Sequence, residues 1–506
     1  MKKLVIVRRF SQVFFLGAFI YILWSTTYPL RGVLLPDILF KVDPLIMIFI
    51  SISERVILPG IVFAIFMLIL TLALGRFFCG WVCPLGTIID ICGAVALRKR
   101  KTRLAESKNK KLRSIKFYIV GFTAAASFLG IQLAWIFDPM VIVARFISLN
   151  LIPSLTSILD NIFIFLIRQL NFYGPLYDLY RGLKASFLGT HPHYFAHSGI
   201  VFTFFLLISL SVLIARRLWC RAICPLGALY SVAGRFSLLG RSVEGCVDCL
   251  RCKNDCRMQA INDDLTYIKG ECVLCMDCIY DCPPGATKFT WPASVVSPGR
   301  DDKKGITRRE FIFLMFSSFL SLGFRNRREM GVEEKLRDII RPPAALKEKE
   351  FLGRCIRCGN CMKVCITNGL QPVIFESGLE GIWTPHLVPE TGYCEYNCTL
   401  CGEVCPTGAI PVLSLEEKKK TRLGLAEIDP SICIAWSGNK DCIVCQEHCP
   451  VSKKAIRLVS RKIASKTALR PYVDRRLCVG CGICQKKCPT RPVRAIRVFS
   501  YQSDRT

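Results

Sequence analysis

The chain has 506 residues, of which 52% are hydrophobic and 29 are cysteine, and its formal net charge is +30. This apolarity favours membrane spans over one very large core, and the length allows about three or four domains. Cysteines that recur in fixed groups of four along so long a chain argue against a secreted disulfide scaffold. No nucleic-acid motif accompanies the basic residues, so we attribute the charge to membrane topology and to neutralisation of thiolate-bound clusters.

Four apolar runs predict an α-helical membrane domain over residues 1–240. Each run is long enough to cross a bilayer, and the runs are residues 13–27, 57–74, 115–137 and 200–215. The loop between the second and third runs is strongly basic, which places it and the N-terminus in the cytoplasm. Residues 140–168 are also apolar, but polar residues interrupt them and a crossing there would violate the charge rule. We interpret them as an interfacial or re-entrant element on the outer face.

An internal repeat lies at the cytoplasmic ends of the second and fourth runs. Both copies read C-x-x-x-C-P-L-G, at residues 79–86 and 220–227. Cysteines four apart share one face of a helix, so each pair could offer two thiolates to a metal or form a redox dithiol. The alternative is that the two cysteines at each helix end are buried structural residues. We interpret the unmatched Cys92 as a small core residue of this kind. The duplication favours an additional redox or metal site at Cys79, Cys83, Cys220 and Cys224, although the spacing leaves open whether the four sulfurs meet.

Three of the five histidines, His191, His193 and His197, cluster before the fourth run on its expected outer side. A quinol-oxidising site needs a proton acceptor near the membrane surface, and histidine can serve in that role. The alternative, which we favour on prior grounds, is a polar loop that caps a helix. Asp138 and Arg145 are weaker candidates for the same site.

The first two cysteine tetrads predict a cytoplasmic ferredoxin domain over residues 241–295. Each reads C-x-x-C-x-x-C-x-x-x-C, the bacterial spacing in which the fourth cysteine ligates the other of two clusters. Zinc is the alternative, but zinc sites use pairs of C-x-x-C rather than repeated tetrads. Arg257 replaces the proline that usually follows the first tetrad. The expected ligand sets are Cys246, Cys249, Cys252 with Cys282, and Cys272, Cys275, Cys278 with Cys256.

Four more tetrads lie within residues 346–506 and predict further α+β ferredoxin-like domains. Two keep the regular spacing, one opens with a gap of three residues, and one opens with a gap of eight, which makes Cys433 the least regular ligand. The spacing does not determine which tetrads pair. The expected ligands are Cys355, Cys358, Cys361 and Cys365; Cys394, Cys398, Cys401 and Cys405; Cys433, Cys442, Cys445 and Cys449; and Cys478, Cys481, Cys484 and Cys488. The six tetrads together predict six [4Fe–4S] clusters.

The linker between the cluster regions, residues 296–345, contains a candidate export signal. Residues 307–312 read T-R-R-E-F-I and precede an apolar stretch that ends at Phe324, which resembles a twin-arginine signal. The apolar stretch is short for an ordinary span, and a domain loaded with clusters in the cytoplasm must cross folded. We therefore expect the C-terminal domain in the periplasm, with the segment retained as an anchor. The alternative is a basic flank beside a short buried helix.

These motifs together resemble two known families. Residues 1–290 resemble the NapH-type membrane ferredoxins through the C-x-x-x-C-P repeats and the two-cluster domain. Residues 305–500 resemble the NapG and MauM-type ferredoxins through the twin-arginine segment, the four tetrads and the stretch from Gly381 to Tyr396. The chain is thus similar to a fusion of the two. The resemblance implies a multi-pass protein of the bacterial cytoplasmic membrane that takes electrons from the quinol pool and delivers them to a periplasmic reductase or cytochrome.

Motifs for independent catalysis are missing from the sequence: we find no haem attachment site, no nucleotide-binding glycine fingerprint and no nucleophile elbow. We therefore expect an electron-transfer component with no catalytic residues of its own, whose partners are membrane lipid, the quinone pool and the acceptor, but not nucleic acid. Two alternatives stay open. One is a reductase for metal-cofactor maturation of a partner enzyme, and the other is a redox-sensing membrane regulator.

Overall fold

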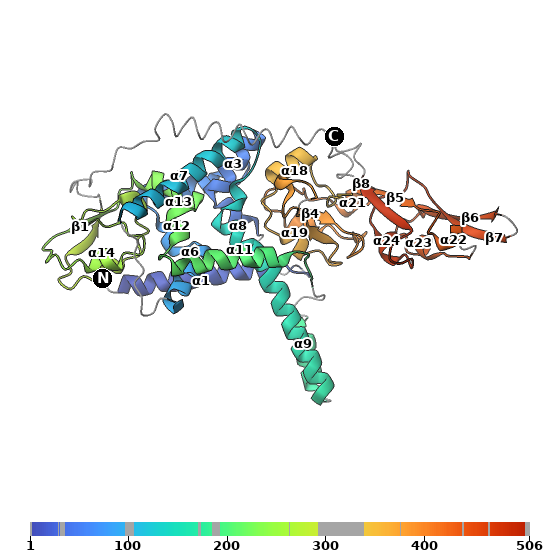
Figure 1. Cartoon of the computed structure of the whole chain (residues 1–506), viewed down its shortest axis with the longest axis horizontal. Helices are drawn as coiled ribbons and strands as arrows, with labels where there is room; N and C mark the ends of the chain where they lie inside the picture. Colours follow the sequence, from blue (N-terminus) through green and yellow to red (C-terminus); the bar gives the residue numbers. More distant parts are fainter. Residues whose placement is uncertain are drawn as a thin grey trace. The chain divides into compact units, whose positions relative to one another are not determined.

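The structure is a computed structural model of the chain (Figure 1), and it forms two compact units. The first comprises Met1–Leu23, Ile38–Ile147 and Gly199–Phe324, and the second comprises Trp24–Asp37, Ser148–Ser198 and Arg325–Thr506. This division differs from the expected domains, because residues 148–198 group with the C-terminal clusters. The structure describes residues 3–28, 30, 36–96, 106–170, 174–184, 193–262, 264–291, 338–374, 376–437, 440–463 and 466–500.

The first unit combines apolar helices with the first pair of tetrads. Helix α4 contains no charged residue, whereas α7 begins in the basic loop, so that it covers Glu106–Phe128 rather than the expected 115–137. The helices of this unit are α1 (Lys3–Ser25), α2 (Asp37–Lys41), α3 (Pro44–Glu54), α4 (Ile61–Leu74), α5 (Phe77–Trp81), α6 (Pro84–Ala96), α7, η1 (Ala134–Ile136), α8 (Pro139–Phe146), α11 (Ser198–Leu210), η4 (Ser211–Leu213), α12 (Leu218–Ala222) and α13 (Pro225–Gly234).

Two helical stretches of the described chain are long and apolar enough to cross a membrane, Lys3–Ser25 and Pro139–Gln169. The second contains the residues that we interpreted as interfacial or re-entrant. A π-helical segment, Ile147–Leu151, interrupts it. Shorter apolar helices cover Pro44–Glu54, Ile61–Leu74, Pro84–Val95 and Ser198–Leu213.

Helices α3 and α8 begin in the same way. Asp43 caps α3 by accepting hydrogen bonds from the backbone N–H groups of residues 45 and 46, at 2.9 and 3.4 Å. Asp138 caps α8 by accepting from residues 140 and 141, both at 2.9 Å. A proline at the first helical position follows each aspartate, where its missing N–H group costs nothing. The same local sequence therefore starts both helices.

The first ferredoxin region is framed by two antiparallel strands, β1 (Gly240–Val243) and β2 (Thr287–Thr290), which lie on either side of the two tetrads in sequence. Between them lie α14 (Arg251–Asp255), η5 (Lys269–Glu271) and α15 (Asp277–Tyr280). A small core holds the region to α1, because Val5 packs with Leu274, Met276 and Ile279. These residues lie between the cysteines of the second tetrad, so the core positions the cluster loop.

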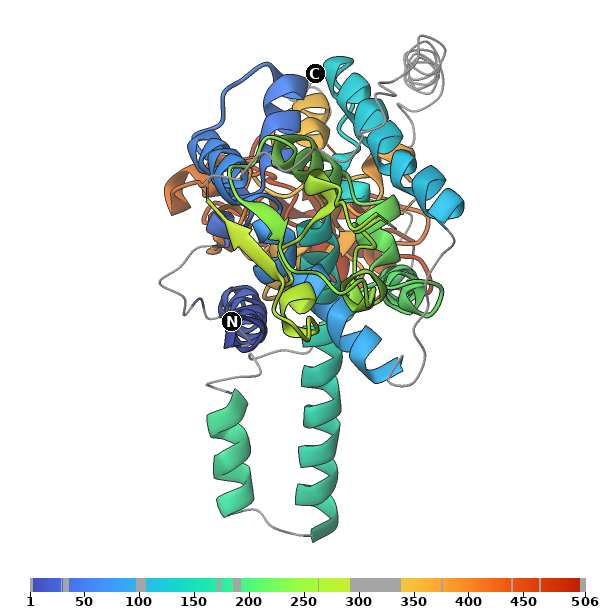
Figure 2. The same cartoon turned by 90° about the vertical axis from the view of Figure 1, so that its left-hand side faces the viewer.

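In the second unit, α9 (Ile152–Leu170) and α10 (Pro175–Leu183) lie side by side (Figure 2). The Tyr180 hydroxyl donates to Asp160 Oδ1 at 3.1 Å, and Lys184 Nζ pairs with Asp160 Oδ2 at 2.8 Å. Phe163 stacks on Tyr180 with the ring centroids 5.3 Å apart. These contacts fix the register of the two helices.

The four C-terminal tetrads lie among short helices and two-stranded antiparallel sheets (Figure 1). The pairing of β5 with β8 encloses the last two tetrads, as the pairing of β1 with β2 encloses the first two. The hairpin of β6 and β7 lies between the last two tetrads. The elements are α18 (Glu348–Arg354), α19 (Asn360–Lys363), β3 (Leu370–Pro372), η6 (Leu379–Gly381), β4 (Pro385–Leu387), α20 (Leu400–Glu403), α21 (Leu415–Lys420), β5 (Gly424–Ile428), α22 (Ile434–Ser437), α23 (Val444–Glu447), β6 (Ile456–Ile463), β7 (Lys466–Val473), α24 (Ile483–Lys487) and β8 (Ile496–Ser500).

Candidate functional site

The loops of the four regular tetrads share one backbone conformation. In each loop, the residues immediately before and after the second cysteine have positive φ: Asp248 and Leu250, Leu274 and Met276, Arg357 and Gly359, and Gly480 and Gly482. This conformation costs a non-glycine residue on the order of 1–3 kcal/mol. It turns the chain around the cysteines and directs successive N–H groups inward, an arrangement that suits an anionic group. One such contact runs from Asp248 N–H to Cys246 Sγ at 3.4 Å.

The cysteines of the first unit group across the two tetrads. Cys252 interacts electrostatically with Cys246 and Cys282, while Cys272 and Cys275 each interact with Cys256. These groupings bring cysteines of both tetrads together, and the two expected crossed sets remain a prediction. Burial raises the pKa of Cys272 to about 11, so its thiol is neutral at pH 7 unless a metal takes the place of the proton.

The third and fourth tetrads pair in the second unit. One pocket is lined by Cys355, Cys358 and Cys361 of the third tetrad together with Cys405 of the fourth. The remaining cysteine of the third tetrad, Cys365, groups with the other three cysteines of the fourth tetrad, which are Cys394, Cys398 and Cys401. Burial raises the pKa of Cys401, and the neighbouring thiols of Cys394, Cys365 and Cys398 raise it further. The fourth cysteine is thus exchanged between these two tetrads.

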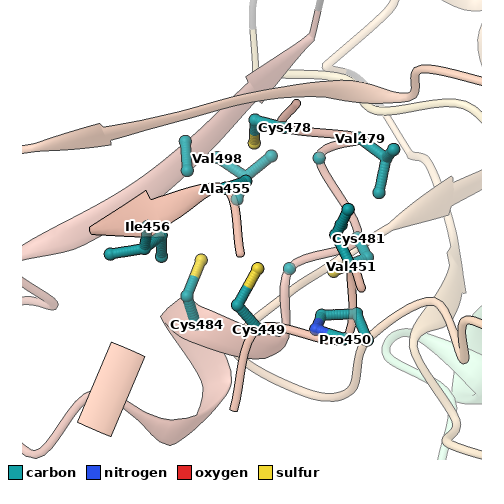
Figure 3. Close-up of a pocket in the computed structure, with 13 residues that line it drawn as sticks. Cys449, Pro450, Val451, Ala455, Ile456, Cys478, Val479, Cys481, Cys484 and Val498 are labelled. Atoms are coloured by element: carbon teal, nitrogen blue, oxygen red, sulfur yellow. The ribbon is translucent and has the colours of Figure 1, made fainter. Parts of the chain in front are cut away.

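The fifth and sixth tetrads pair in the same crossed way. Figure 3 shows the sulfur atoms of Cys449, Cys478 and Cys484 turned toward the space between them, and Cys481 lines the same pocket. Cys449 belongs to the fifth tetrad and the other three to the sixth. The rest of the lining includes Val451, Ala455, Ile456 and Val498, so the pocket is apolar apart from the sulfurs.

Cys433, the least regular expected ligand, lies in the second pocket of this pair. It is 8% exposed and lines the pocket together with Cys442, Cys445 and Cys488. The eight-residue gap that follows it contains α22 (Ile434–Ser437), whose first turn is closed by the Ser437 hydroxyl donating to the Cys433 carbonyl oxygen at 2.9 Å. A short helix therefore takes up the extra residues, and the cysteine still reaches the pocket.

One hydrogen bond joins the two C-terminal pairs. The backbone N–H of Cys394 donates to the carbonyl oxygen of Cys481 at 2.8 Å. The two cysteines belong to different pairs, so the set around Cys394 and the set around Cys481 are neighbours. Lys418 interacts electrostatically with both thiols and donates to the carbonyl oxygen of Tyr396 at 2.8 Å. The four cysteine sets of the second unit therefore follow one another in a row.

The cysteine sets that line pockets offer the donors that [4Fe–4S] clusters require. Three of the sets combine four thiol donors with an apolar lining, whereas Cys246 and Cys249 of the first tetrad are exposed, and the regular loops bring N–H groups toward the sulfurs. In the described part of the chain, no three His, Cys, Asp or Glu side chains converge on the position of a single metal ion.

The repeated C-x-x-x-C-P-L-G segments come together in the first unit. All four of their cysteines are buried, at 4–8% exposure. Cys220 interacts electrostatically with Cys79, and Cys224 interacts with Cys220, Cys79 and Cys83. The two segments are in contact, because Arg217 Nη1 donates to the carbonyl oxygen of Cys79 at 3.0 Å, and their four thiols are neighbours. Cys92 lies outside this group, half-buried on α6.

The expected quinol-site residues have different surroundings in the structure. His193 Nε2 lies 2.9 Å from the carbonyl oxygen of Cys365, whereas His197 is exposed immediately before α11. His191 lies outside the described residues. Asp138 caps α8, and Arg145 is buried with its guanidinium over the Trp135 ring, both within the first unit. The candidate twin-arginine segment, residues 307–324, also lies outside the described residues.

Arg257, which replaces the expected proline, is a site residue that the motif did not reveal. Its guanidinium pairs with Asp277 at 2.5 Å and with Asp90 at 3.0 Å. Asp90 also pairs with Arg217 at 2.7 Å, and Asp277 pairs with Arg8 at 3.5 Å. The network connects α1, α6 and α12 to the ferredoxin loop. In the sequence, the arginine in place of the usual proline was the one feature that indicated a special role for this position.

Glu271 precedes Cys272 and is buried between two cations. Arg76 Nη1 donates to Glu271 Oε2 at 2.8 Å, and Lys116 Nζ donates to its other oxygen. Burial alone would raise the pKa of Glu271, but the attraction of Lys116 and Arg76 brings it down to about 2. The carboxylate is therefore ionised at pH 7 and ties α7 and the repeat to the cluster loop.

Comparison with known proteins also indicates iron–sulfur binding. A family described as "4Fe-4S binding domain" matches residues 56–104 and 196–243, which contain the two repeats. A second family with the same description matches residues 471–494, which contain the sixth tetrad. No solved structure matches the chain.

Several curated ferredoxin-type proteins are similar to the chain. MauM of Methylobacillus flagellatus, a methylamine utilization protein, is 32% identical over 200 residues, which are 39% of this chain and 81% of the relative. MauM of Methylorubrum extorquens is 34% identical over 153 residues, 29% of this chain and 67% of the relative. NapG of Escherichia coli is 34% identical over 154 residues, 29% of this chain and 65% of the relative. The chain therefore belongs to the family of iron–sulfur ferredoxin-type proteins that includes MauM and NapG.

Proposed function

We propose that the chain is a membrane-bound relay that takes electrons from membrane quinol and passes them to a periplasmic reductase or cytochrome. The observation that carries the proposal is the continuous row of cysteine sets in the second unit, joined by the hydrogen bond from Cys394 N–H to Cys481 O. Bound [4Fe–4S] clusters supply one-electron transfer. The membership of the MauM and NapG family supports the same chemistry.

Six sets of four cysteines hold the clusters in this proposal, in three crossed pairs. The regular loops of the sets enclose the cysteines with inward N–H groups, which tune the reduction potential through hydrogen bonds to sulfur. Because the fourth cysteine of each tetrad serves the other set, neither member of a pair can be loaded correctly without the other tetrad.

The membrane part of the proposal rests on the apolar helices. Lys3–Ser25 has the length of a span, Pro139–Gln169 is kept as the interfacial or re-entrant element of the outer face, and the shorter apolar helices add further membrane-embedded segments. The basic loop before α7 stays in the cytoplasm, and the twin-arginine segment carries the C-terminal domain to the periplasm. A reporter fused after residue 500 tests this topology. Activity only of a periplasmic reporter supports it, and activity only of a cytoplasmic reporter contradicts it.

His193 is the proposed proton acceptor for quinol oxidation. A carbonyl oxygen can only accept, so His193 Nε2 donates to Cys365 O at 2.9 Å, and in the neutral ring Nδ1 is then the acceptor. The loop around His193 is held in place, because Tyr194 O accepts from Asn368 and Gln371 at 2.9 and 3.1 Å. A quinol releases two protons and two electrons, so an acceptor for protons beside a cysteine set suits its oxidation.

Stopped-flow reduction of the purified full chain by a soluble quinol tests this role. We expect His193→Gln to slow quinol-dependent bleaching at least tenfold, since positioned proton acceptors contribute about 10²–10⁴-fold. Reduction by dithionite and the iron content should stay unchanged. His197→Gln, in the same loop but exposed, is the matched control and should retain the wild-type rate. Equal rates for both variants would contradict the assignment of His193.

A further inference from the structure

The internal repeat of the first unit is longer than the cysteine motif. An arginine stands three residues before the first cysteine of each copy, so that both copies read R-x-x-C-x-x-x-C-P-L-G, at residues 76–86 and 217–227. The aspartate–proline starts of α3 and α8 precede the two copies in the same order. The first unit is therefore built from two related halves, with residues 148–198 inserted in the second half and grouped with the other unit.

The two arginines cross over between the halves. Arg217, from the second copy, donates from Nη1 to the carbonyl oxygen of Cys79 in the first copy at 3.0 Å. A Cβ atom at Gly86 would lie 3.7 Å from Arg217 Nη2, and one at Gly227 would lie 2.8 Å from Arg76 Nη2. Each guanidinium therefore lies against the glycine of the other copy. Arg76 is 0% and Arg217 is 1% exposed, so both positive charges are buried beside the four cysteines.

The backbone of each copy also faces its cysteines in the same way. Gly86 N–H donates to Cys83 Sγ at 3.5 Å, and Gly227 N–H donates to Cys224 Sγ at 3.2 Å. Proline at the position after each cysteine starts a helix whose first N–H groups point back toward the sulfur. Two helix N-termini and two arginines thus converge from opposite halves on four sulfurs.

The polar groups around the four sulfurs suit an anionic group. Buried charges are normally paired, and each of the several N–H groups of a buried guanidinium needs an acceptor. Arg217 is paired with Asp90 and Arg76 is paired with Glu271 through Nη1, while Nε and Nη2 of Arg76, both buried, have no hydrogen-bond partner among the described residues. A [4Fe–4S] cluster held by four thiolates carries about −2 when oxidised, a charge that the two guanidinium groups and the two helix N-termini would stabilise.

We propose that Cys79, Cys83, Cys220 and Cys224 together hold one further [4Fe–4S] cluster, with two ligands from each half and Arg76 and Arg217 as its charge partners. The family described as "4Fe-4S binding domain" matches each half separately, at residues 56–104 and 196–243. The structure adds that the two matches contribute to one site. Neither copy alone has the four ligands.

The site adjoins the loop of the second tetrad. A Cβ atom at Gly80, between the first two ligands, would lie 2.0 Å from the carbonyl oxygen of Val273, so the helix of the first copy touches the loop that starts at Cys272. Trp81 Nε1 also donates to the carbonyl oxygen of Leu274 at 3.0 Å. The seventh centre is therefore next to the set formed by Cys272, Cys275, Cys278 and Cys256. Its role as a link in electron transfer rests on the proposed function, whereas its occupancy does not.

Metal and sulfide analysis of the anaerobically purified full chain tests the occupancy. Seven clusters correspond to about 28 irons per chain and six to about 24, since each holds four. We expect Cys83→Ser combined with Cys224→Ser to lower iron and acid-labile sulfide by about four each. Cys92→Ser, in the same helical region but outside the site, is the matched control and should leave both unchanged. Equal iron in wild type and double variant, or one zinc per chain in place of the four irons, would overturn the proposal.

A second variant keeps the test decisive if the double variant fails to fold. Arg76→Gln removes a buried positive charge beside the proposed centre and retains all ligands. We expect the iron content to stay at its wild-type value, while an EPR redox titration with dithionite shows one centre shifted to lower potential. A titration identical to wild type would contradict the proximity of Arg76 to a cluster. Neither measurement uses quinol, so failure of quinol oxidation would leave these results unaffected.

Discussion

The guanidinium of Arg257 bridges to Asp90, with Nη1 3.0 Å from Oδ2, and so ties the ferredoxin region to helix α6 of the repeat. The same side chain pairs with Asp277 in the second cysteine loop. A proline at this position, as the regular motif would have, could form neither ion pair. The substitution thus fixes the cluster loop against the helical part of the unit.

Replacement of Arg257 by alanine should destabilise the first unit. Asp90 and Asp277 are only 10% and 13% exposed, and each would lose one of its two cationic partners, because Asp90 keeps Arg217 and Asp277 keeps Arg8; the expected cost is about 1.5–3 kcal/mol. Thermal unfolding of the detergent-solubilised chain measures the effect. Arg457→Ala removes an exposed pair with Asp474 and should cost less than about 1 kcal/mol. Equal shifts in the two variants would show that the bridge adds no stability.

Exchange of the fourth cysteine makes a specific prediction for the last pair of tetrads. Because the Cys449 side chain lines the pocket of Cys478, Cys481 and Cys484, Cys449→Ser should disturb the cluster in that pocket. The same substitution should spare the cluster of Cys433, Cys442 and Cys445. Cys488→Ser should have the reverse effect. EPR spectra of the reduced variants distinguish the two outcomes. If each variant loses the signal of its own tetrad instead, the crossed pairing is wrong.

Gly80→Ala tests the contact between the repeat and the ferredoxin loop. The added Cβ would lie 2.0 Å from a backbone carbonyl oxygen, which cannot move without the loop, so we expect a loss of about 1–3 kcal/mol. Thermal unfolding again reports the change. Gly182→Ala in α10 is the control, since its Cβ meets nothing within 4 Å and the variant should be neutral or slightly more stable. A stable Gly80→Ala chain with normal iron content would contradict the close approach.

The second unit should lose stability in mild acid through His386. Burial lowers the pKa of His386 to about 4, and the nearby Arg341 adds to the effect, so the folded chain keeps the ring neutral. The unfolded chain binds a proton below about pH 6.5. The free energy of unfolding therefore falls as the pH drops from about 6.5 to about 4, by at most about 3 kcal/mol. His386→Gln should flatten this part of the profile of thermal midpoint against pH. A slope unchanged from wild type would exclude His386 as its source.

The regular tetrads could be predicted from sequence because their ligands lie close together along the chain. The pairing of the last four could not, since it depends on strand pairs such as β5 with β8 that bring distant segments together. Cys433 illustrates the same limit: the motif contains no sign that α22 takes up the extra residues. The NapH-type part of the resemblance and the twin-arginine signal remain predictions.

Part of the repeat could be predicted from the sequence. The duplicated cysteines indicated a site, but the role of the arginines three residues before them depends on contacts between the two copies, which the structure shows. The grouping of residues 148–198 with the C-terminal clusters could not be predicted, because it depends on hydrogen bonds such as that between His193 and Cys365. Hydropathy alone assigned the segment to the membrane domain.

The most direct test of the relay is an anaerobic EPR titration of native membranes that contain the full chain, with a membrane quinol as the only reductant. We expect the signals of reduced [4Fe–4S] clusters to appear with quinol and to disappear when an oxidised periplasmic cytochrome is added. Clusters that dithionite reduces but no quinol reduces would contradict the proposed function.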